Sequence, residues 1–140
     1  FVVSGPGDNS FPQLLDALEK KEPVEKIKNL IYLKEGKSHK TRKEELQDQD
    51  GLPQLPYEYY GKFYGIDGYL QKTFMGKKTM AYHSSLGCPF TCSFCAVVPI
   101  FNARWKGKSA ANIYKDIRWL IDNYGLDAIE FHDNNFFTSR

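Results

Sequence analysis

Cys88-Pro89-Phe90-Thr91-Cys92-Ser93-Phe94-Cys95 holds all three cysteines of the chain in one short stretch. The spacing C-x-x-x-C-x-x-C allows a tight loop to turn three thiolates inward, and this donor set suits three irons of an iron–sulfur cube. The fourth iron would then have no protein ligand. An open metal position is typical of catalytic rather than structural metal sites. The stretch therefore predicts a reactive cofactor site around which the following elements are arranged.

Two other roles for the thiols stay open on the residues alone. A disulfide would leave one cysteine over, and disulfides are typical of oxidising compartments, for which no signal-peptide pattern is visible here. A zinc site would need a fourth ligand, which His83 or His132 could supply, although zinc motifs usually bring cysteines in spaced C-x-x-C pairs. Thiols that only pack as small hydrophobic groups rarely cluster this densely beside glycine, proline and aromatic residues, so the iron–sulfur interpretation is favoured.

The charge balance and the hydropathy of the chain argue against nucleic-acid-binding and membrane-spanning proteins. The 140 residues include 19 Lys and Arg against 17 Asp and Glu, for a net charge of +2, and the two signs are interspersed. No broad basic footprint for nucleic acid is visible, so a nucleic-acid partner is not expected. No run of eighteen apolar residues exists, so we expect no membrane span. We expect a soluble, cytoplasmic protein whose thiols stay reduced.

The residues on both sides of the cysteine loop predict a strand–helix–strand unit. The alternating stretch 79–86 predicts a strand that leads into the loop. Ser109 can cap a helix that runs to about Tyr124, with apolar residues at three- and four-residue steps and Gly125 as its stop. The stretch 128–131 predicts a second strand. Such a βαβ unit has parallel strands joined by a right-handed crossover.

Two spaced motifs resemble those of the radical S-adenosylmethionine (SAM) enzymes. The cysteine loop, with Gly87 before it and Phe94 before its last cysteine, is similar to the family's cluster motif. The segment Asp133-Asn134-Asn135-Phe136 resembles the Asp-Asp/Asn-Asn-Phe signature of the branch with an N-terminal cobalamin-binding domain. The resemblance implies an α/β fold that begins a TIM-type radical SAM barrel, preceded by a linker and the tail of a Rossmann-like domain.

The resemblance also implies roles for individual residues. Cys88, Cys92 and Cys95 would hold a 4Fe-4S cluster. SAM would chelate the open iron and be split by one electron into methionine and a 5′-deoxyadenosyl radical, which abstracts hydrogen. Phe94 would flank the adenine, and Asp133 and Asn134 would help to fix the methionine moiety. Beyond the cluster ligands, no catalytic residue is predicted.

The partners and further cofactors follow from the same resemblance. An external one-electron reductant and a small-molecule or peptide substrate are implied, and the substrate contacts are expected in later strands. Cobalamin-dependent methylation is one outcome found in this branch. No D-x-H-x-x-G motif occurs, so a cobalamin ligand would have to lie upstream of Phe1.

The first fifty residues predict part of a second domain. The stretch 1–4 predicts the end of a buried strand, and the turn 5–9 precedes a helix for which Ser10 and Gln13 form a capping box. The stretches 27–34 and 37–42 flank Glu35-Gly36 and predict a lysine-rich hairpin. Gly5-Pro6-Gly7-Asp8 weakly resembles the Gly-x-Gly-Glu-like turn of the cobalamin-binding domain.

We therefore divide the chain into three parts. Residues 1–50 form the tail of a cobalamin-binding-like α/β domain, residues 51–75 form a linker and an aromatic-rich segment, and residues 76–140 form the first βαβ unit of a truncated barrel. The aromatic residues of 57–69 are expected to pack against the barrel rather than to stack on nucleobases. We expect the chain to be the front portion of a longer polypeptide.

Two other functions remain as alternatives. Pro99 and the basic stretch 104–109 faintly resemble radical methylthiotransferases that act on RNA, but the segment 133–136 argues against that group. A non-catalytic electron-transfer module is the other alternative, although ferredoxin-like motifs supply four cysteines for each cluster.

Overall fold

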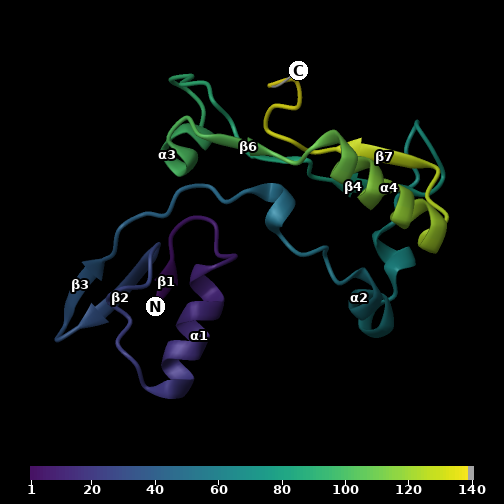
Figure 1. Cartoon of the computed structure of the whole chain (residues 1–140). Coiled ribbons are helices and arrows are strands. Elements are labelled where there is room, and N and C mark those ends of the chain that lie inside the picture. Colours follow the sequence, from purple (N-terminus) through teal and green to yellow (C-terminus); the bar gives the residue numbers. More distant parts are fainter. Residues whose placement is uncertain (139–140) are drawn as a thin grey trace. The chain divides into compact units, whose positions relative to one another are not determined.

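A computed structural model describes residues 1–138 and divides the chain into two compact units, Phe1–Leu46 and the part from Gln47 onward (Figure 1). We describe each unit by itself. None of the helices in the described part of the chain is both long and apolar enough to cross a bilayer.

The first unit packs one helix against a small antiparallel sheet. Its elements are β1 (Val2–Val3), α1 (Ser10–Lys20), β2 (Leu30–Lys34) and β3 (Lys37–Lys40), and β2 lies between the other two strands. The core joins the apolar stripe of the helix to the inner face of β2, with members Leu14, Ala17, Ile27, Leu30 and Tyr32. The predicted hairpin is confirmed: Glu35 and Gly36 both have positive φ, as a tight two-residue turn between antiparallel strands requires.

Two predictions for this unit are wrong. Ser10 does not cap the helix, because Asn9 occupies the N-cap position and no side chain bonds the helix end. Ser10 is instead buried inside the first turn, where Asn29 Nδ2 lies 3.4 Å from its hydroxyl oxygen. The first strand is also not buried among the described residues, since Val2 is 59% exposed at the sheet's edge.

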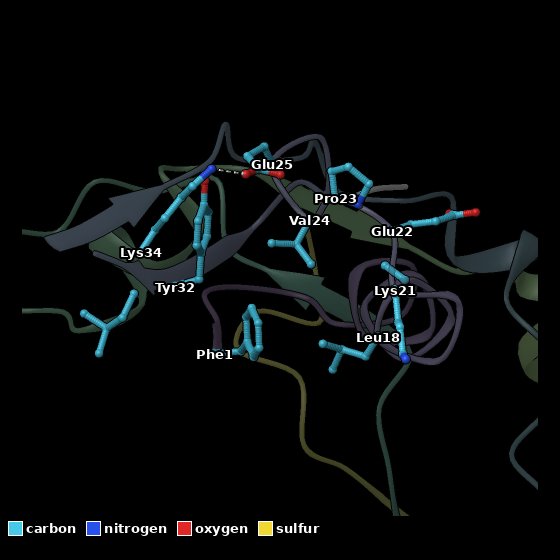
Figure 2. A pocket seen from close by; sticks show the side chains of 11 residues that line it. Phe1, Leu18, Lys21, Glu22, Pro23, Val24, Glu25, Tyr32 and Lys34 are labelled. Carbon is cyan, nitrogen blue, oxygen red and sulfur yellow. Dashed lines mark hydrogen bonds and ion pairs between the residues drawn. The ribbon is translucent and has the colours of Figure 1, made fainter. Parts of the chain in front are cut away.

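A hollow of about 560 Å³ opens between the end of α1 and β2. Figure 2 shows the side chains of Phe1, Leu18 and Tyr32 around it and the ion pair of Lys34 with Glu25 at its rim. The pair has an N–O distance of 2.9 Å and is half exposed, so it contributes little to stability. Its lining residues all belong to the first unit.

The second unit contains the predicted βαβ unit. Strands β4 (Thr79–Tyr82) and β7 (Ala128–Phe131) pair in parallel, with Met80 opposite Ile129 and Tyr82 opposite Phe131. The connecting helix α4 (Ala110–Tyr124) packs on this pair through the fully buried Leu120 (Figure 1). Ser109 accepts a hydrogen bond from the Asn112 backbone N–H at 3.3 Å, and Gly125 ends the helix in a left-handed conformation. Both helix signals are thus confirmed.

The predicted strand 79–86 is in fact two strands in different sheets. After β4, the backbone leaves the parallel pair, and β5 (Ser85–Gly87) pairs antiparallel with β6 (Trp105–Gly107). The physical cause lies at Ser84, whose N–H donates to the carboxylate of Asp133 rather than to a neighbouring strand. A short helix, α3 (Val97–Phe101), follows the cysteine loop and leads into β6.

The aromatic-rich segment forms helical turns that the sequence did not predict. It contains α2 (Tyr57–Tyr64) and η2 (Ile66–Tyr69), and a short 3-10 helix, η1 (Gln49–Gly51), precedes it. The packing prediction is right for Tyr57, which stacks on Trp119 at 6.0 Å between ring centroids. It is wrong for the rest of the aromatic residues, which stay exposed in the described chain: Tyr59, Tyr60, Phe63, Tyr64 and Tyr69.

A half-buried polar cluster ties α4 and the end of β6 to β4. The Asp116 carboxylate accepts hydrogen bonds from the Tyr82 hydroxyl at 2.7 Å and from the Lys108 ammonium at 2.6 Å. Burial, and then the hydrogen bond to Asp116, raises the pKa of Tyr82 well above its ordinary value. Tyr82 therefore stays neutral and donates to the carboxylate.

We expect Asp116→Ala to lower the free energy of unfolding by about 1 to 3 kcal/mol, because the Tyr82 hydroxyl and the Lys108 ammonium lose their shared acceptor. Urea titration of the purified protein measures this loss. Asp122→Ala is the control, since Asp122 pairs with Arg118 on the exposed side of the same helix and should change stability by less than about 0.5 kcal/mol. Equal effects of the two substitutions would contradict the assignment.

A candidate cofactor site beyond the parallel strands

The cysteine loop follows Gly87, where the surrounding atoms leave no room for a side chain. Gly87 has φ +83°, and a Cβ there would meet the carbonyl oxygen of Arg104 and lie 3.2 Å from Cγ of Phe101. It is the register partner of Trp105 in the β5–β6 ribbon. The ribbon and α3 therefore clamp both ends of the loop.

The three thiols are free, with Cys92 exposed and Cys88 and Cys95 half-buried. The loop turns at its end, where the Cys95 N–H donates to the Cys92 carbonyl at 3.1 Å. Within residues 1–138, no three His, Cys, Asp or Glu side chains gather around a single metal ion.

The three thiols have the chemistry that an iron–sulfur cluster needs. Each thiolate of such a cluster binds a different iron, so the sulfurs need not converge on one point. The loop supplies three soft donors with accessible positions and no residue that competes for them by a disulfide. The residues present are compatible with a 4Fe-4S cluster that keeps one iron open.

Asp133 lies beside the strand that delivers the cysteine loop. Its carboxylate accepts hydrogen bonds from the Ser84 N–H at 3.1 Å, from the Ser84 hydroxyl at 3.1 Å and from the Ser85 hydroxyl. Because β4 and β7 are parallel, the residues that follow both strands meet at the same edge of the sheet. No pattern in the sequence distinguishes these two serines from ordinary residues of the predicted strand 79–86.

The other predicted cofactor residues are exposed. Phe94 is 91% exposed at the tip of the loop, and Asn134 is exposed after β7. Neither is held against the cysteines in the described chain. Beyond them, Phe136 packs on Phe131 with ring centroids 4.6 Å apart and on Phe137 at 5.1 Å, so the end of the 133–136 motif anchors to β7.

Two histidines extend the same end of the sheet. His83 and His132 follow β4 and β7, and their rings meet edge to face at 6.1 Å. His132 Nε2 also lies 3.4 Å from a Glu130 carboxylate oxygen. This pair is exposed, so the polar groups beyond the two strands present an open polar edge next to the cysteine loop.

Curated relatives match along nearly the whole chain. An uncharacterized methyltransferase of Pyrococcus horikoshii is 32% identical over 141 residues, which cover 99% of this chain and 29% of the relative. An anaerobic magnesium-protoporphyrin IX monomethyl ester cyclase of Synechocystis is 26% identical over 96% of this chain and 26% of the relative. The chain thus spans between a quarter and a third of the length of these relatives. No protein-family model matches it.

Solved structures share the fold. The cobalamin-dependent SAM radical enzyme OxsB, determined with aqua-cobalamin and SAM bound, matches 96% of this chain and 18% of its own chain with a TM-score of 0.72 and 18% identity. The radical SAM methyltransferase TsrM from Kitasatospora setae, determined with cobalamin and a [4Fe-4S] cluster, matches 95% of this chain and 26% of its own with a TM-score of 0.61 and 19% identity. Together with the curated relatives, this shared fold confirms the resemblance to the radical SAM enzymes.

Proposed function

We propose that this chain is part of a radical SAM enzyme of the branch that carries a cobalamin-binding domain. One observation carries the proposal. Three free thiols in a C-x-x-x-C-x-x-C loop follow β5. Ser84 before this strand and Ser85 within it donate hydrogen bonds to Asp133, beyond the ends of the parallel pair β4–β7. The names of the relatives and of the solved neighbours support the same conclusion.

The chain's own residues would hold and enclose the cofactors. Cys88, Cys92 and Cys95 would bind three irons as thiolates. When bound, the cluster would pass one electron from an external reductant to SAM for its reductive cleavage. Phe94, at the open tip of the loop, would flank the adenine. Because both ends of the loop are held, the three thiolates would keep fixed positions. Burial and hydrogen bonds around the cluster would then tune its reduction potential.

Asp133 would bond both to the protein and to SAM. Its carboxylate already accepts hydrogen bonds from Ser84 and Ser85, and it would share its remaining acceptor capacity with the ammonium of SAM. Asn134, exposed beside it, would add an amide for the same methionine moiety. The serine contacts would fix the carboxylate before the ligand arrives.

The domain assignment is part of the proposal. The βαβ unit would begin a TIM-type barrel over residues 76–140, with 51–75 as linker. Residues 1–50 would end a cobalamin-binding-like domain, which is consistent with the exposed edge of β1 at Val2. Methyl transfer is the reaction that the methyltransferase relatives favour, and the cobalamin ligand would lie outside this chain.

Anaerobic reconstitution with iron and sulfide tests the proposal. The protein in its full reading frame should take up about four irons per chain, and the electron paramagnetic resonance (EPR) signal of the reduced protein should change when SAM is added. Binding of one zinc per chain with no uptake of iron would contradict the proposed function.

A substitution at Asp133 should separate ligand binding from cluster formation. We expect Asp133→Asn to weaken SAM binding by about 1 to 3 kcal/mol, roughly 5-fold to 150-fold, because a charged acceptor for the ligand ammonium becomes neutral. The bound iron should stay unchanged. Equilibrium titration with SAM and an iron assay measure the two quantities.

Asp127 provides the matched control. Its carboxylate also accepts backbone hydrogen bonds, from Lys77 at 2.9 Å and Lys78 at 2.8 Å, but it lies at the start of β7 rather than beyond its end. These bonds hold the pKa of Asp127 below its usual value. Asp127→Asn should leave the affinity for SAM unchanged, and an equal loss of affinity in both variants would remove Asp133 from the site.

A further inference from the structure

The indole of Trp105 carries a buried donor that the chain does not use. Trp105 Nε1 is shielded from solvent and has no hydrogen-bond partner within the described residues. A buried tryptophan N–H usually finds an acceptor, and leaving one unpaired costs about 1 to 3 kcal/mol. A phenylalanine would fill similar space without that cost, so the N–H calls for an explanation.

The strand register places this donor next to the cysteine loop. Trp105 pairs with Gly87, the residue before Cys88, and Gly107 pairs with Ser85. Directly opposed residues of antiparallel strands lie on the same face, so the indole shares its face with Ser85, whose hydroxyl donates to Asp133.

Gly107 lets the indole lie flat on this face. A Cβ at Gly107 would come within 2.6 Å of Cη2 and 2.8 Å of Cζ2 of Trp105. The six-membered ring therefore lies against Gly107, and Nε1 belongs to the side of the indole that carries Cζ2. The indole thus lies on the ribbon face that also carries Ser85, a hydrogen-bond donor to Asp133, and its own residue pairs with Gly87, which directly precedes Cys88.

We propose that Trp105 is a cofactor-binding residue whose indole N–H donates a hydrogen bond to an anionic acceptor that the cysteine loop brings to the ribbon. The inference rests on the proposed function. An indole N–H is a donor only, so it selects an acceptor and excludes the ammonium that Asp133 would bind. Two acceptors have this chemistry: a sulfur of the cluster and the carboxylate of SAM.

Replacement of the Trp105 side chain by 3-benzothienylalanine tests the inference, because it exchanges the N–H for sulfur and keeps the bicyclic shape. The same replacement at Trp119 is the control, since that ring stacks on Tyr57 and meets Tyr124 edge to face. Both variants are reconstituted in the full reading frame. Bound iron, the cluster's midpoint potential and the dissociation constant of SAM are then measured.

The two acceptors give different results. Hydrogen bonds to cluster sulfurs help to set the potential, so loss of a bond to sulfur should make the midpoint potential more negative without SAM present. Loss of a bond to the SAM carboxylate should instead raise its dissociation constant about tenfold, equivalent to 1.4 kcal/mol. Either result, with normal iron content and an unchanged Trp119 variant, supports the inference.

Failure of the inference is distinguishable from failure of the proposed function. If the wild-type protein takes up iron and binds SAM while the Trp105 variant matches it in both potential and affinity, the inference alone is overturned. If the wild-type protein takes up no iron, the proposed function falls and the inference falls with it.

Discussion

Replacement of Cys92 by alanine is expected to abolish cluster binding, reducing iron from about four per chain to near zero. Each of the three thiolates would bind one iron, so two remaining ligands on an exposed loop cannot hold the cube. Cys92 is the exposed thiol, at the turn of the loop. Iron and sulfide assays after anaerobic reconstitution, with EPR of the reduced protein, measure the effect.

The three cysteines should also behave as one unit. Residues that act together are non-additive, so double substitutions among Cys88, Cys92 and Cys95 should be no worse than the single ones. Ser93→Ala is the matched control, because Ser93 is an exposed neighbour in the same loop and supplies no thiolate. Graded losses of iron that add from one substitution to the next would contradict a shared cluster.

Elements with local signals could be predicted from the sequence. The helix that begins after Ser109 and ends before Gly125 carries its own cap and stop, and the turn at Glu35 and Gly36 forces a hairpin. These signals depend on neighbouring residues, so they are readable without the fold. The parallel pairing of the strands at 79 and 128 then follows from the helix between them.

Elements set by distant partners could not be predicted in this way. The break after Tyr82 depends on Asp133, which bonds to Ser84 across 49 positions in the sequence. Ser10 does not cap α1, and its buried hydroxyl instead lies against Asn29, 19 positions away in the sequence. In each case a local propensity loses to a polar contact that exists only after the chain has folded.

The candidate site shows the same division. The three cysteines were readable because their spacing alone defines a ligand set. The serines that bond to Asp133 could not be identified from the sequence, nor could the unpaired N–H of Trp105. Their roles depend on strand register and burial, which only the fold defines. The sequence therefore predicts which cofactor the loop suits, and the structure identifies the side chains that surround it.

The second large effect is expected from Gly87→Ala, which should destabilise the β5–β6 ribbon and with it the cysteine loop. Gly87 has φ +83°, a region that costs an ordinary residue about 1 to 2 kcal/mol. The added Cβ would also meet the Arg104 carbonyl oxygen. That oxygen belongs to the backbone and cannot rotate away, so overpacking should add about 1 to 3 kcal/mol.

Gly125→Ala separates the two causes. Gly125 has φ +65° but no neighbouring atom within 4 Å of the added Cβ, so only the conformational cost of about 1 to 2 kcal/mol should appear. Urea unfolding should therefore rank Gly87→Ala below Gly125→Ala in stability, and only Gly87→Ala should lose iron on reconstitution. If the two variants are equally stable and both bind iron, the close approach of Arg104 does not hold the loop. The clamp at its start would then have to come from the Trp105 side of the ribbon alone.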